Sequence, residues 1–368
     1  MGTPTPAGRH ALLLPGSIGM GHHALAEAVG GELTARGWTT ETADVMALLG
    51  GVGHRLGERV FRGLMSTPGA FDALHFAALR QGSPVAGWLD ARAVGRIVPR
   101  LRPIVAACRP ALVVSVFATA AAAMSRLKPE RPGVKTLTVC SDLDPHRLWV
   151  HPGTDCYLVK SPASAALMRR FDPDATVVVA PTPVRAAFYA APSRAEARAA
   201  LDLPAGEPCA LLMAGGWGLG PLAASARSLA AAGVQTLAVA GRNPRVEAEL
   251  RALAANEPRL HAFGFTDRVA ELMAAADVVI TTSGDTCSEA RVVGRRLVLL
   301  DVVAGHGREN LQHELELGGA VVASTEPLLL TRSVSRELDA SGDPAPDLGR
   351  RELWRNGMDE ALRAIRLE

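Results

Sequence analysis

The hydrophobic positions of this chain form short continuous runs, and stretches rich in alanine separate them. Apolar runs without alternation are typical of strands buried on both faces, as in parallel sheets covered by helices. The pattern therefore predicts an α/β protein in which strand and helix alternate twice over. The expected strands lie at 10–16, 110–118, 134–142, 155–161 and 176–184, and then at 208–216, 234–242, 259–265, 276–284, 296–303 and 319–325.

This succession predicts two doubly wound, Rossmann-like domains. The length of 368 residues agrees, because a single core stops growing at about 250–300 residues. A segment with three prolines and no strand signal separates the two series of runs, and the last residues form an amphipathic helix. The expected boundaries are an N-terminal domain at 1–190, a linker at 191–204, a C-terminal domain at 205–345, and a tail at 346–368 that packs back across the junction.

Residues 51–109 depart from the pattern. They contain nine Arg against three acidic residues, together with Phe61, Phe71, Phe76 and Trp88. Basic and apolar helices together favour a surface that lies on anionic lipid. The alternative is an ordinary Arg-rich helical insertion that packs on its own domain.

Composition narrows the class of protein. The net charge of +2 gives no reason to expect nucleic acid as a partner. The five cysteines show no paired metal-ligand spacing, which fits a reducing compartment. The first residues do not resemble a signal peptide, and the longest uncharged run, 110–125, is shorter than the roughly 20 residues of a membrane helix. We expect a cytoplasmic protein, with a peripheral position on the inner face of the plasma membrane as an additional hypothesis.

Glycine-rich loops follow several of the expected strands. The first, "GSIGMGHHALAEA", carries Gly16, Gly19 and Gly21 before two histidines and a helix. In the C-terminal half, "AGGWGLGP", "GRNP" and "TTSGDTCSEA" follow three strands, and the last opens a helix at about Thr286. Backbone N–H groups at a helix start favour a phosphate, and glycine lets the phosphate approach closely.

Seven such motifs occur in an order that resembles one family. They are "GMGHHALAEA", "CSDLDPHRLWVHPGTDCYLVKS", "APTPVRAAF", "LLMAGGWGLGPL", "VAGRNPRV", "GFTDRVAELMAAADVVITTSG" and "AGHGRENLQHELELGGA". The chain resembles, from about residue 11 to 325, the GT-B glycosyltransferases of the monogalactosyldiacylglycerol synthase and processive diacylglycerol glucosyltransferase group, relatives of MurG. The resemblance implies a cleft between two Rossmann-like domains, with a UDP-sugar on the C-terminal domain and the acceptor on the N-terminal one.

The same resemblance suggests the reacting groups. The acceptor hydroxyl loses a proton as it attacks the anomeric carbon, so a base is required nearby. His22 matches the family histidine and is the first candidate; a role in capping or positioning the helix is its alternative. Asp142 could orient His22, act as the base or cap a turn. Gly19 and Gly21 would let the acceptor approach, His146 and His151 would either stabilise their segment or meet the acceptor, and His23 is expected to be structural or solvent-facing.

The donor side is inferred in the same way. Glu289 matches the carboxylate that accepts hydrogen bonds from ribose, although Thr286 and Glu289 also have the spacing of a capping box. Phe265 and Thr266 would lie near uracil. The remaining expected donor-site residues are Gly216, Trp217, Gly218, Arg242, Ser283, Gly284, Asp285, Thr286, His306 and Asn310. Asp142 and Asp144 spell the D-x-D of a different glycosyltransferase fold, but the resemblance to GT-B enzymes implies no metal and no other cofactor.

Two departures from the family pattern concern the donor. The loop "SGDTCSEA" is one residue shorter and places Asp285 beside the expected diphosphate. His306 and Gly307 stand where the family has the Gln and Glu that hold sugar hydroxyls. Loss of such polar groups changes the choice of substrate, so the identity of the sugar is open.

The first prediction is therefore an inverting transferase that moves a sugar from UDP to a hydroxyl of a lipid, diacylglycerol-like, or another amphiphile. The alternatives are a UDP-sugar 2-epimerase type of isomerase, a glycosyltransferase of specialised metabolism, and a degenerate protein that binds UDP-sugars without turnover.

Overall fold

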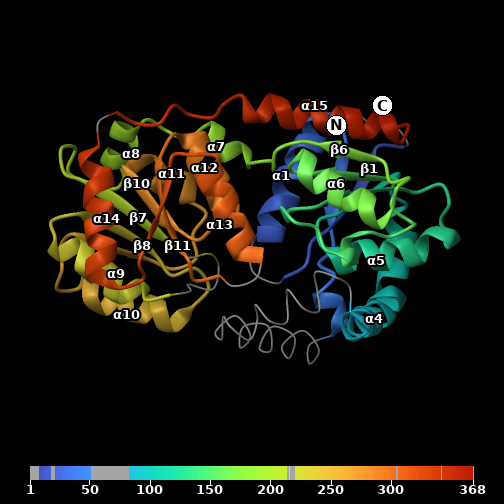
Figure 1. The fold of residues 1–368 in the computed structure, drawn as a ribbon, viewed down its shortest axis with the longest axis horizontal. Coiled ribbons are helices and arrows are strands. Elements are labelled where there is room, and N and C mark those ends of the chain that lie inside the picture. Colours follow the sequence, from blue (N-terminus) through green and yellow to red (C-terminus); the bar gives the residue numbers. More distant parts are fainter. Residues whose placement is uncertain are drawn as a thin grey trace, which may run out of the picture. The chain divides into compact units, whose positions relative to one another are not determined.

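The structure, a computed structural model, describes residues 8–17, 21–50, 83–213, 215, 220–303, 306–340 and 342–367. It divides into two compact units, the first made of 1–183 with 349–368 and the second of 184–348. Each unit contains a parallel six-stranded sheet with helices on both faces (Figure 1). The predicted α/β class with two Rossmann-like units is confirmed.

The sheet of the first unit has the order β2-β1-β3-β4-β5-β6, and all of its pairs are parallel. Its strands are β1 (His10–Leu14), β2 (Thr39–Thr42), β3 (Leu112–Ser115), β4 (Lys135–Val139), β5 (Cys156–Val159) and β6 (Val177–Val179). Its longer helices are α1 (Gly21–Ala35), α4 (Pro84–Cys108), α5 (Ala118–Leu127), α6 (Pro162–Phe171) and α15 (Arg350–Ala364). Short 3-10 turns lie at Ala47–Leu49, Lys128–Glu130 and Arg147–Trp149.

Both faces of this sheet are buried, which explains its continuous apolar runs. Leu13 belongs to a core cluster with residues of α1 and α15, whereas Leu12 and Leu14 belong to a second cluster with residues of α4 and α5. Successive side chains of one strand therefore enter two different cores. The edge strand β2 has the polar sequence TTET and is exposed, and for that reason the apolar pattern did not reveal it.

The sheet of the second unit has the order β12-β11-β10-β7-β8-β9 and is also parallel. Its strands are β7 (Cys209–Met213), β8 (Gln235–Val239), β9 (Leu260–Phe263), β10 (Val278–Thr281), β11 (Arg296–Leu300) and β12 (Ala320–Ala323). Its helices are α7 (Ala186–Tyr189), α8 (Arg194–Ala200), α9 (Leu222–Ala231), α10 (Pro244–Ala254), α11 (Val269–Ala275), α12 (Asp285–Val293), α13 (His306–Glu316) and α14 (Pro327–Asp339).

The boundary between the units differs from the sequence expectation of a linker at 191–204. That segment contains α8, which packs on α11 within the second unit. Ala197 is fully buried there, and the Arg198 guanidinium donates to the Ala275 carbonyl at 3.0 Å and to Asp277 Oδ2 at 2.8 Å. The chain therefore enters the second unit at residue 184, because a buried arginine with these partners belongs to a folded core rather than to a linker.

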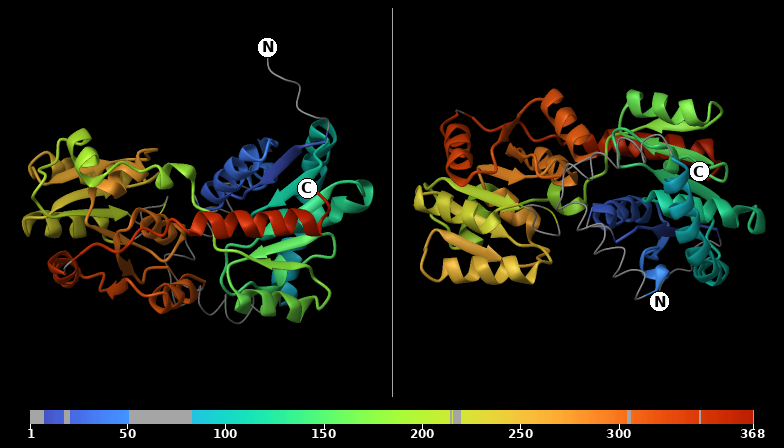
Figure 2. Two further views of the ribbon diagram at one scale, coloured as in Figure 1. Left: turned by 90° about the horizontal axis from the view of Figure 1, so that it is seen from above. Right: turned by 60° about the horizontal axis from the view of Figure 1, so that its bottom comes forward.

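The tail expected at 346–368 forms α15, which belongs to the first unit and packs on β5 and β6 (Figure 2). Trp354 and Met358 are buried in the same cluster as Leu13. Arg351 and Arg355 donate to the carboxylate of Glu32 on α1, at 3.0 and 2.8 Å. Burial alone would raise the pKa of Glu32, but these two guanidinium groups outweigh it and lower the pKa. The last helix is thus an integral part of the N-terminal unit.

The insertion expected at 51–109 is described from residue 83 onward, and residues 51–82 lie outside the described part. Ser83 caps α4 by accepting a hydrogen bond from the Ala86 N–H at 3.2 Å. One side of the helix packs into the core through Val94, Ile97, Val98, Leu101 and Val105. In this part the insertion is a packed helix of its domain, as the second of the two interpretations held.

Two helical glycines of the first unit provide a matched test of this packing. A Cβ on Gly357 of α15 would lie 2.5 Å from the Ala180 Cβ, whereas a Cβ on Gly95 of α4 would meet nothing within 4 Å. We predict that Gly357→Ala lowers the free energy of unfolding by about 1–3 kcal/mol through overpacking. Gly95→Ala should raise it by about 0.5–1 kcal/mol, because alanine favours a helix.

Chemical unfolding followed by tryptophan fluorescence measures both changes, since Trp38, Trp88, Trp149 and Trp354 all lie in the first unit. Equal effects of the two substitutions would contradict the close contact between α15 and the end of β6.

Candidate functional site

The carboxyl ends of the parallel strands meet at one edge of each sheet, where α/β proteins bind their ligands. In the first unit, this edge carries the turn after β1, the segment 140–151 after β4, and the residues that follow β5 and β6. In the second unit, it carries the loops after β8, β9, β10 and β11. Most of the predicted site residues lie at these two edges.

His22 is the second residue of α1 and is half-buried. Its imidazole packs edge-on against the ring of Phe117, with 5.0 Å between centroids and 64° between planes. Phe117 lies between β3 and α5, so a neighbouring strand holds the orientation of the histidine. A Cβ on Gly16 would lie 2.6 Å from the same phenyl ring, which explains the first glycine of the turn. Gly21 begins α1 and is exposed, whereas Gly19 lies outside the described residues.

His23 is structural rather than solvent-facing. Its Nε2 lies 3.2 Å from Ser17 Oγ and 3.1 Å from Asp44 Oδ2, and the Ser17 N–H donates to the other oxygen of Asp44 at 3.2 Å. Burial would raise the pKa of Asp44, but the hydrogen bonds from His23 and from the Met46 N–H lower it. A charged carboxylate therefore ties the start of the turn to the helix residue next to His22.

Asp142 lies in the segment after β4 and is held by a buried tryptophan. The Trp149 indole N–H donates to Asp142 Oδ2 at 2.7 Å, and Trp149 is only 2% exposed. The Nε2 of His146 lies 3.8 Å from the same oxygen. The segment thus places a carboxylate and an imidazole side by side at the edge of the sheet, where either can exchange a proton with a ligand.

His151 stabilises this segment from within. Its Nε2–H donates to the Leu148 carbonyl at 2.8 Å, and its backbone N–H donates to the Tyr157 hydroxyl at 2.8 Å. The Tyr157 hydroxyl donates in turn to the His151 carbonyl at 3.0 Å. Burial lowers the pKa of His151 and keeps the ring neutral. Of the two functions expected for this residue, the structural one matches its contacts.

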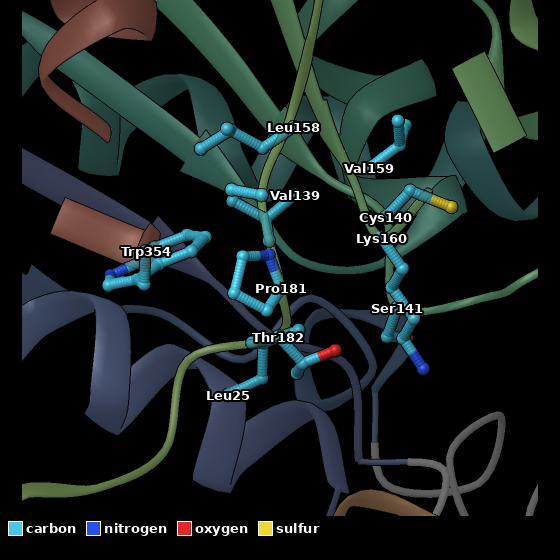
Figure 3. A pocket seen from close by; sticks show the side chains of 11 residues that line it. Leu25, Val139, Cys140, Ser141, Leu158, Val159, Lys160, Pro181, Thr182 and Trp354 are labelled. Carbon is cyan, nitrogen blue, oxygen red and sulfur yellow. The ribbon is translucent and has the colours of Figure 1, made fainter. Parts of the chain in front are cut away.

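A pocket of about 200 Å³, its open mouth included, lies at the same edge (Figure 3). Residues after β4, β5 and β6 line it together with Trp354 of α15, and Trp354 and Lys160 lie on opposite sides of Pro181 in this view. It is smaller than the roughly 300–1,000 Å³ of most ligand pockets, so it accommodates a small group rather than a whole lipid. The sequence analysis did not assign Lys160 to the site, although a lone Lys directly after a strand was a signal.

Arg242 and Phe265, two predicted donor-site residues, meet at the edge of the second sheet. The Arg242 Cζ lies 4.5 Å from the centroid of the Phe265 ring, and Phe265 is 56% exposed. Thr266 accepts a hydrogen bond from the Arg268 N–H at 3.1 Å, which shapes the turn after β9. An exposed aromatic face beside a guanidinium is suited to stacking a flat ring.

The start of α12 differs from the sequence expectation by one residue. The helix begins at Asp285, its N-cap is Gly284, and no side chain caps it. Thr286 therefore lies inside the helix, and the capping box considered for Thr286 and Glu289 is not formed. The Ser283 hydroxyl donates to the Gly307 carbonyl at 2.6 Å, which connects this helix start to that of α13.

Glu289 is buried and forms an ion pair that the sequence analysis did not foresee. Its Oε1 accepts a hydrogen bond from Arg185 Nη2 at 3.0 Å. The Arg185 guanidinium also lies 5.0 Å from the ring of Phe188, which is fully enclosed in the core. Arg185 belongs to the "PTPVRAAF" motif, so the signal was present, but the spacing of 104 residues between the partners hid the pair.

The start of α13 explains one of the two family departures. A Cβ on Gly307 would lie 2.4 Å from Val303 Cγ1, so glycine is required while valine occupies this position. His306 is the first residue of α13 and Asn310 lies one turn later, partly buried. Gly216, Trp217 and Gly218 lie outside the described residues.

Comparisons with known proteins agree with this geometry. A family model described as monogalactosyldiacylglycerol (MGDG) synthase matches residues 22–176, a range that begins at His22. A probable monogalactosyldiacylglycerol synthase 2 of Oryza sativa subsp. japonica is 32% identical over 220 residues, covering 56% of this chain and 46% of that protein. The processive diacylglycerol beta-glucosyltransferase of Bacillus subtilis (strain 168) is 26% identical over 236 residues, covering 63% and 62%. The match thus spans about half to three-fifths of these relatives.

Solved structures share the fold across both units. The MurG of Acinetobacter baumannii aligns with a TM-score of 0.55 at 16% identity, covering 98% of this chain and all of that chain. A UDP-GlcNAc 2-epimerase from Neisseria meningitidis aligns with a TM-score of 0.61 at 11% identity, covering 96% and 100%. The sequence resemblance is therefore confirmed: the chain has the fold of GT-B glycosyltransferases, and over residues 22–176 it is a monogalactosyldiacylglycerol synthase family domain whose relatives are diacylglycerol glycosyltransferases.

Proposed function

We propose that this protein is an inverting glycosyltransferase that moves a sugar from a UDP-sugar to a hydroxyl of a diacylglycerol-like acceptor. The observation that carries the proposal is the family match over residues 22–176, which includes both candidate catalytic side chains at one sheet edge. The names of the sequence relatives support the acceptor, because both name diacylglycerol.

His22 is the proposed base. Its Nδ1 is buried, so Nε2 is the atom available to accept the proton of the acceptor hydroxyl. An imidazole titrates near neutral pH and can take up this proton without a large shift of its pKa. Asp142 is the second candidate, as a base or as a group that stabilises positive charge on a histidine. Gly19, Gly21 and His146 complete the proposed acceptor side.

The donor would bind to the second unit. The N-terminus of α12, with Gly284 and Thr286, offers N–H groups to the diphosphate, and the favourable end of the helix dipole supports an anion there. Asp285 would have to turn away from that anion or pair with a cation. The carboxylate of Glu289 would accept hydrogen bonds from ribose while Arg185 holds its other side. Neither the mechanism nor the fold calls for a metal.

The choice of sugar would differ from that of relatives with a carboxylate at position 307. Val303 leaves no room for a side chain there, so a sugar hydroxyl cannot be gripped in that way. His306 would make the alternative contact. We therefore leave the sugar open between UDP-glucose, UDP-galactose and UDP-N-acetylglucosamine.

We further propose that the protein works at an anionic membrane surface, on the inner face of the plasma membrane of a cytoplasmic enzyme. The first turns of α4 support this, because Val85, Trp88 and Leu89 are all more than half exposed and Arg92 lies 5.7 Å from the Trp88 ring. Apolar and aromatic side chains beside arginine are typical of interfacial helices. Within the described ranges, no helix has the length and apolarity needed to cross a bilayer.

A second candidate function is sugar-nucleotide isomerisation. The TM-score of 0.61 to a UDP-GlcNAc 2-epimerase, at 11% identity, is the observation in its favour. Incubation of the protein with UDP-sugars, with and without diacylglycerol, separates the possibilities. Release of UDP that depends on acceptor supports transfer, inversion of the sugar without acceptor supports the epimerase, and binding alone supports a degenerate protein. A water-soluble hydroxyl compound that replaces diacylglycerol would instead support specialised metabolism.

We predict that His22→Ala lowers the rate of sugar transfer by roughly 10²–10⁴-fold, the usual effect of losing a general base. UDP affinity should stay nearly unchanged, because His22 lies in the other unit from the donor loops. Acceptor-dependent UDP release and equilibrium UDP binding measure the two quantities.

His261→Gln is the matched control for His22→Ala. His261 bonds Gln235 at the amino end of β8, away from the edge that carries the donor loops, and should leave transfer unchanged. A fully active His22→Ala protein would instead assign the base to Asp142.

For the donor, we predict that Glu289→Gln weakens UDP binding by about tenfold or more, because a hydrogen bond to a charged group contributes about 1.5–3 kcal/mol. The amide keeps the size of the side chain and can still accept from Arg185. Comparison of UDP with uracil as ligands isolates the ribose contribution: an equal loss of affinity for both would argue against contact with ribose.

For the membrane, we predict that the protein floats with anionic liposomes and much less with neutral ones. Trp88→Ser combined with Leu89→Ser should reduce flotation, whereas Leu353→Ser, an equally exposed leucine on α15, should not. Recovery of the unchanged protein in the soluble fraction with both kinds of liposome would remove the proposal.

A further inference from the structure

Three side chains of different chemistry converge at a place that the proposed reaction does not use. His10 opens β1, Glu41 lies in β2, and Cys108 is the last residue of α4. One donor atom of each, a ring nitrogen, a carboxylate oxygen and the sulfur, lies within 4.8 Å of the other two. The three residues come from separate parts of the sequence, so only folding brings them together.

The hydrogen bonds around His10 determine which nitrogen faces the cluster. The Thr39 hydroxyl donates its single proton to the Arg9 carbonyl at 3.3 Å. It must therefore accept from His10 Nδ1, which lies 2.9 Å away. In the neutral ring, Nε2 is then a bare acceptor, and it lies 3.8 Å from Glu41 Oε2. Two acceptors that face each other need a cation or a proton between them.

Cys108 completes the set of donors. Its Sγ lies 3.1 Å from Glu41 Oε2 and donates its proton to that oxygen. Nitrogen, sulfur and carboxylate oxygen at about 2.0–2.3 Å are the ligands of tetrahedral Zn²⁺, which places neighbouring donors about 3.3–3.6 Å apart. The separations of 3.1 and 3.8 Å bracket this range. Small side-chain rotations therefore suffice to close the site.

We propose that His10 Nε2, Glu41 and Cys108 Sγ bind one Zn²⁺, with water as the fourth ligand. On binding, the Cys108 S–H proton leaves to solvent and the thiolate sulfur forms the bond to zinc, without any change of oxidation state. The Thr39 hydroxyl serves as the outer hydrogen-bond partner that holds the imidazole, an arrangement common to zinc-bound histidines. The side chain of Glu41 is half exposed, so the ion can enter directly from solvent.

The position of the site assigns it a structural task. His10 stands at the amino end of β1, whereas the turn that carries His22 follows the carboxyl end of the same strand. The metal would therefore join the start of β1, the exposed edge strand β2 and the end of α4. Because β2 is polar and contributes nothing to the core clusters, such a link would stabilise an edge that packing leaves weak.

The test uses the full chain without an affinity tag, reduced and freed of metal. Titration with Zn²⁺ should show one equivalent bound and a rise in the thermal unfolding midpoint. Titration with Co²⁺, a spectroscopic substitute, should show thiolate-to-metal charge-transfer absorption. Cys108→Ser should abolish this absorption, Glu41→Gln should weaken binding more than tenfold, and Thr39→Val should weaken it by roughly 10–100-fold, as for outer partners of bound histidines.

His313→Asn, a half-buried histidine of α13, is the matched control and should keep full binding. Tryptophan fluorescence of each variant without metal verifies that it is folded. Two results would overturn the proposal. One is the absence of a bound equivalent in the unchanged protein, which would leave an ion pair between His10 and Glu41. The other is binding that persists in Cys108→Ser and Glu41→Gln alike.

Discussion

The burial of both faces of two parallel sheets is the constraint on which the rest of the structure depends. Leu12 and Leu13 enter different cores although they are adjacent in the chain. A strand that buries both of its faces has to be apolar throughout, which leaves the chemistry of the protein to the loops at the strand ends. Because the strands are parallel, those loops gather at one edge of each sheet, and the predicted site residues gather with them.

Close packing then determines how individual side chains lie at these edges. Phe117 rests against both Gly16 and the ring of His22, so the turn and its histidine are held by a neighbouring strand. Trp149 is buried and directs its indole N–H at Asp142. Val303 occupies the space that a side chain at position 307 would need. In each case an apolar contact sets the geometry of a polar group, which is how a site is preorganised before a ligand binds.

The two units differ in how they treat charge. At the edge of the first, carboxylates are paired with neutral or weakly basic partners, as with Asp142 beside Trp149 and His146, and Lys160 lines the pocket nearby. In the second, the buried Glu289 is paired with Arg185, which leaves its other oxygen for a hydroxyl donor. A proton acceptor on one unit and a polar grip for a nucleotide on the other are what transfer from a nucleotide sugar requires.

The sequence by itself determined the class of fold, the two units, nearly all strands and the family domain, because continuous apolar runs and glycine-rich turns are local signals. It did not reveal β2, whose polar residues are held only by pairing with β1, or the crossing at residue 184, because α8 has no strand signal and its Arg198 finds Asp277 only after folding. The partners of Glu289, His23 and Asp142 were likewise decided by tertiary structure. A hydrogen bond between residues far apart in the chain depends on the packing of whole elements, and no local pattern of residues encodes it.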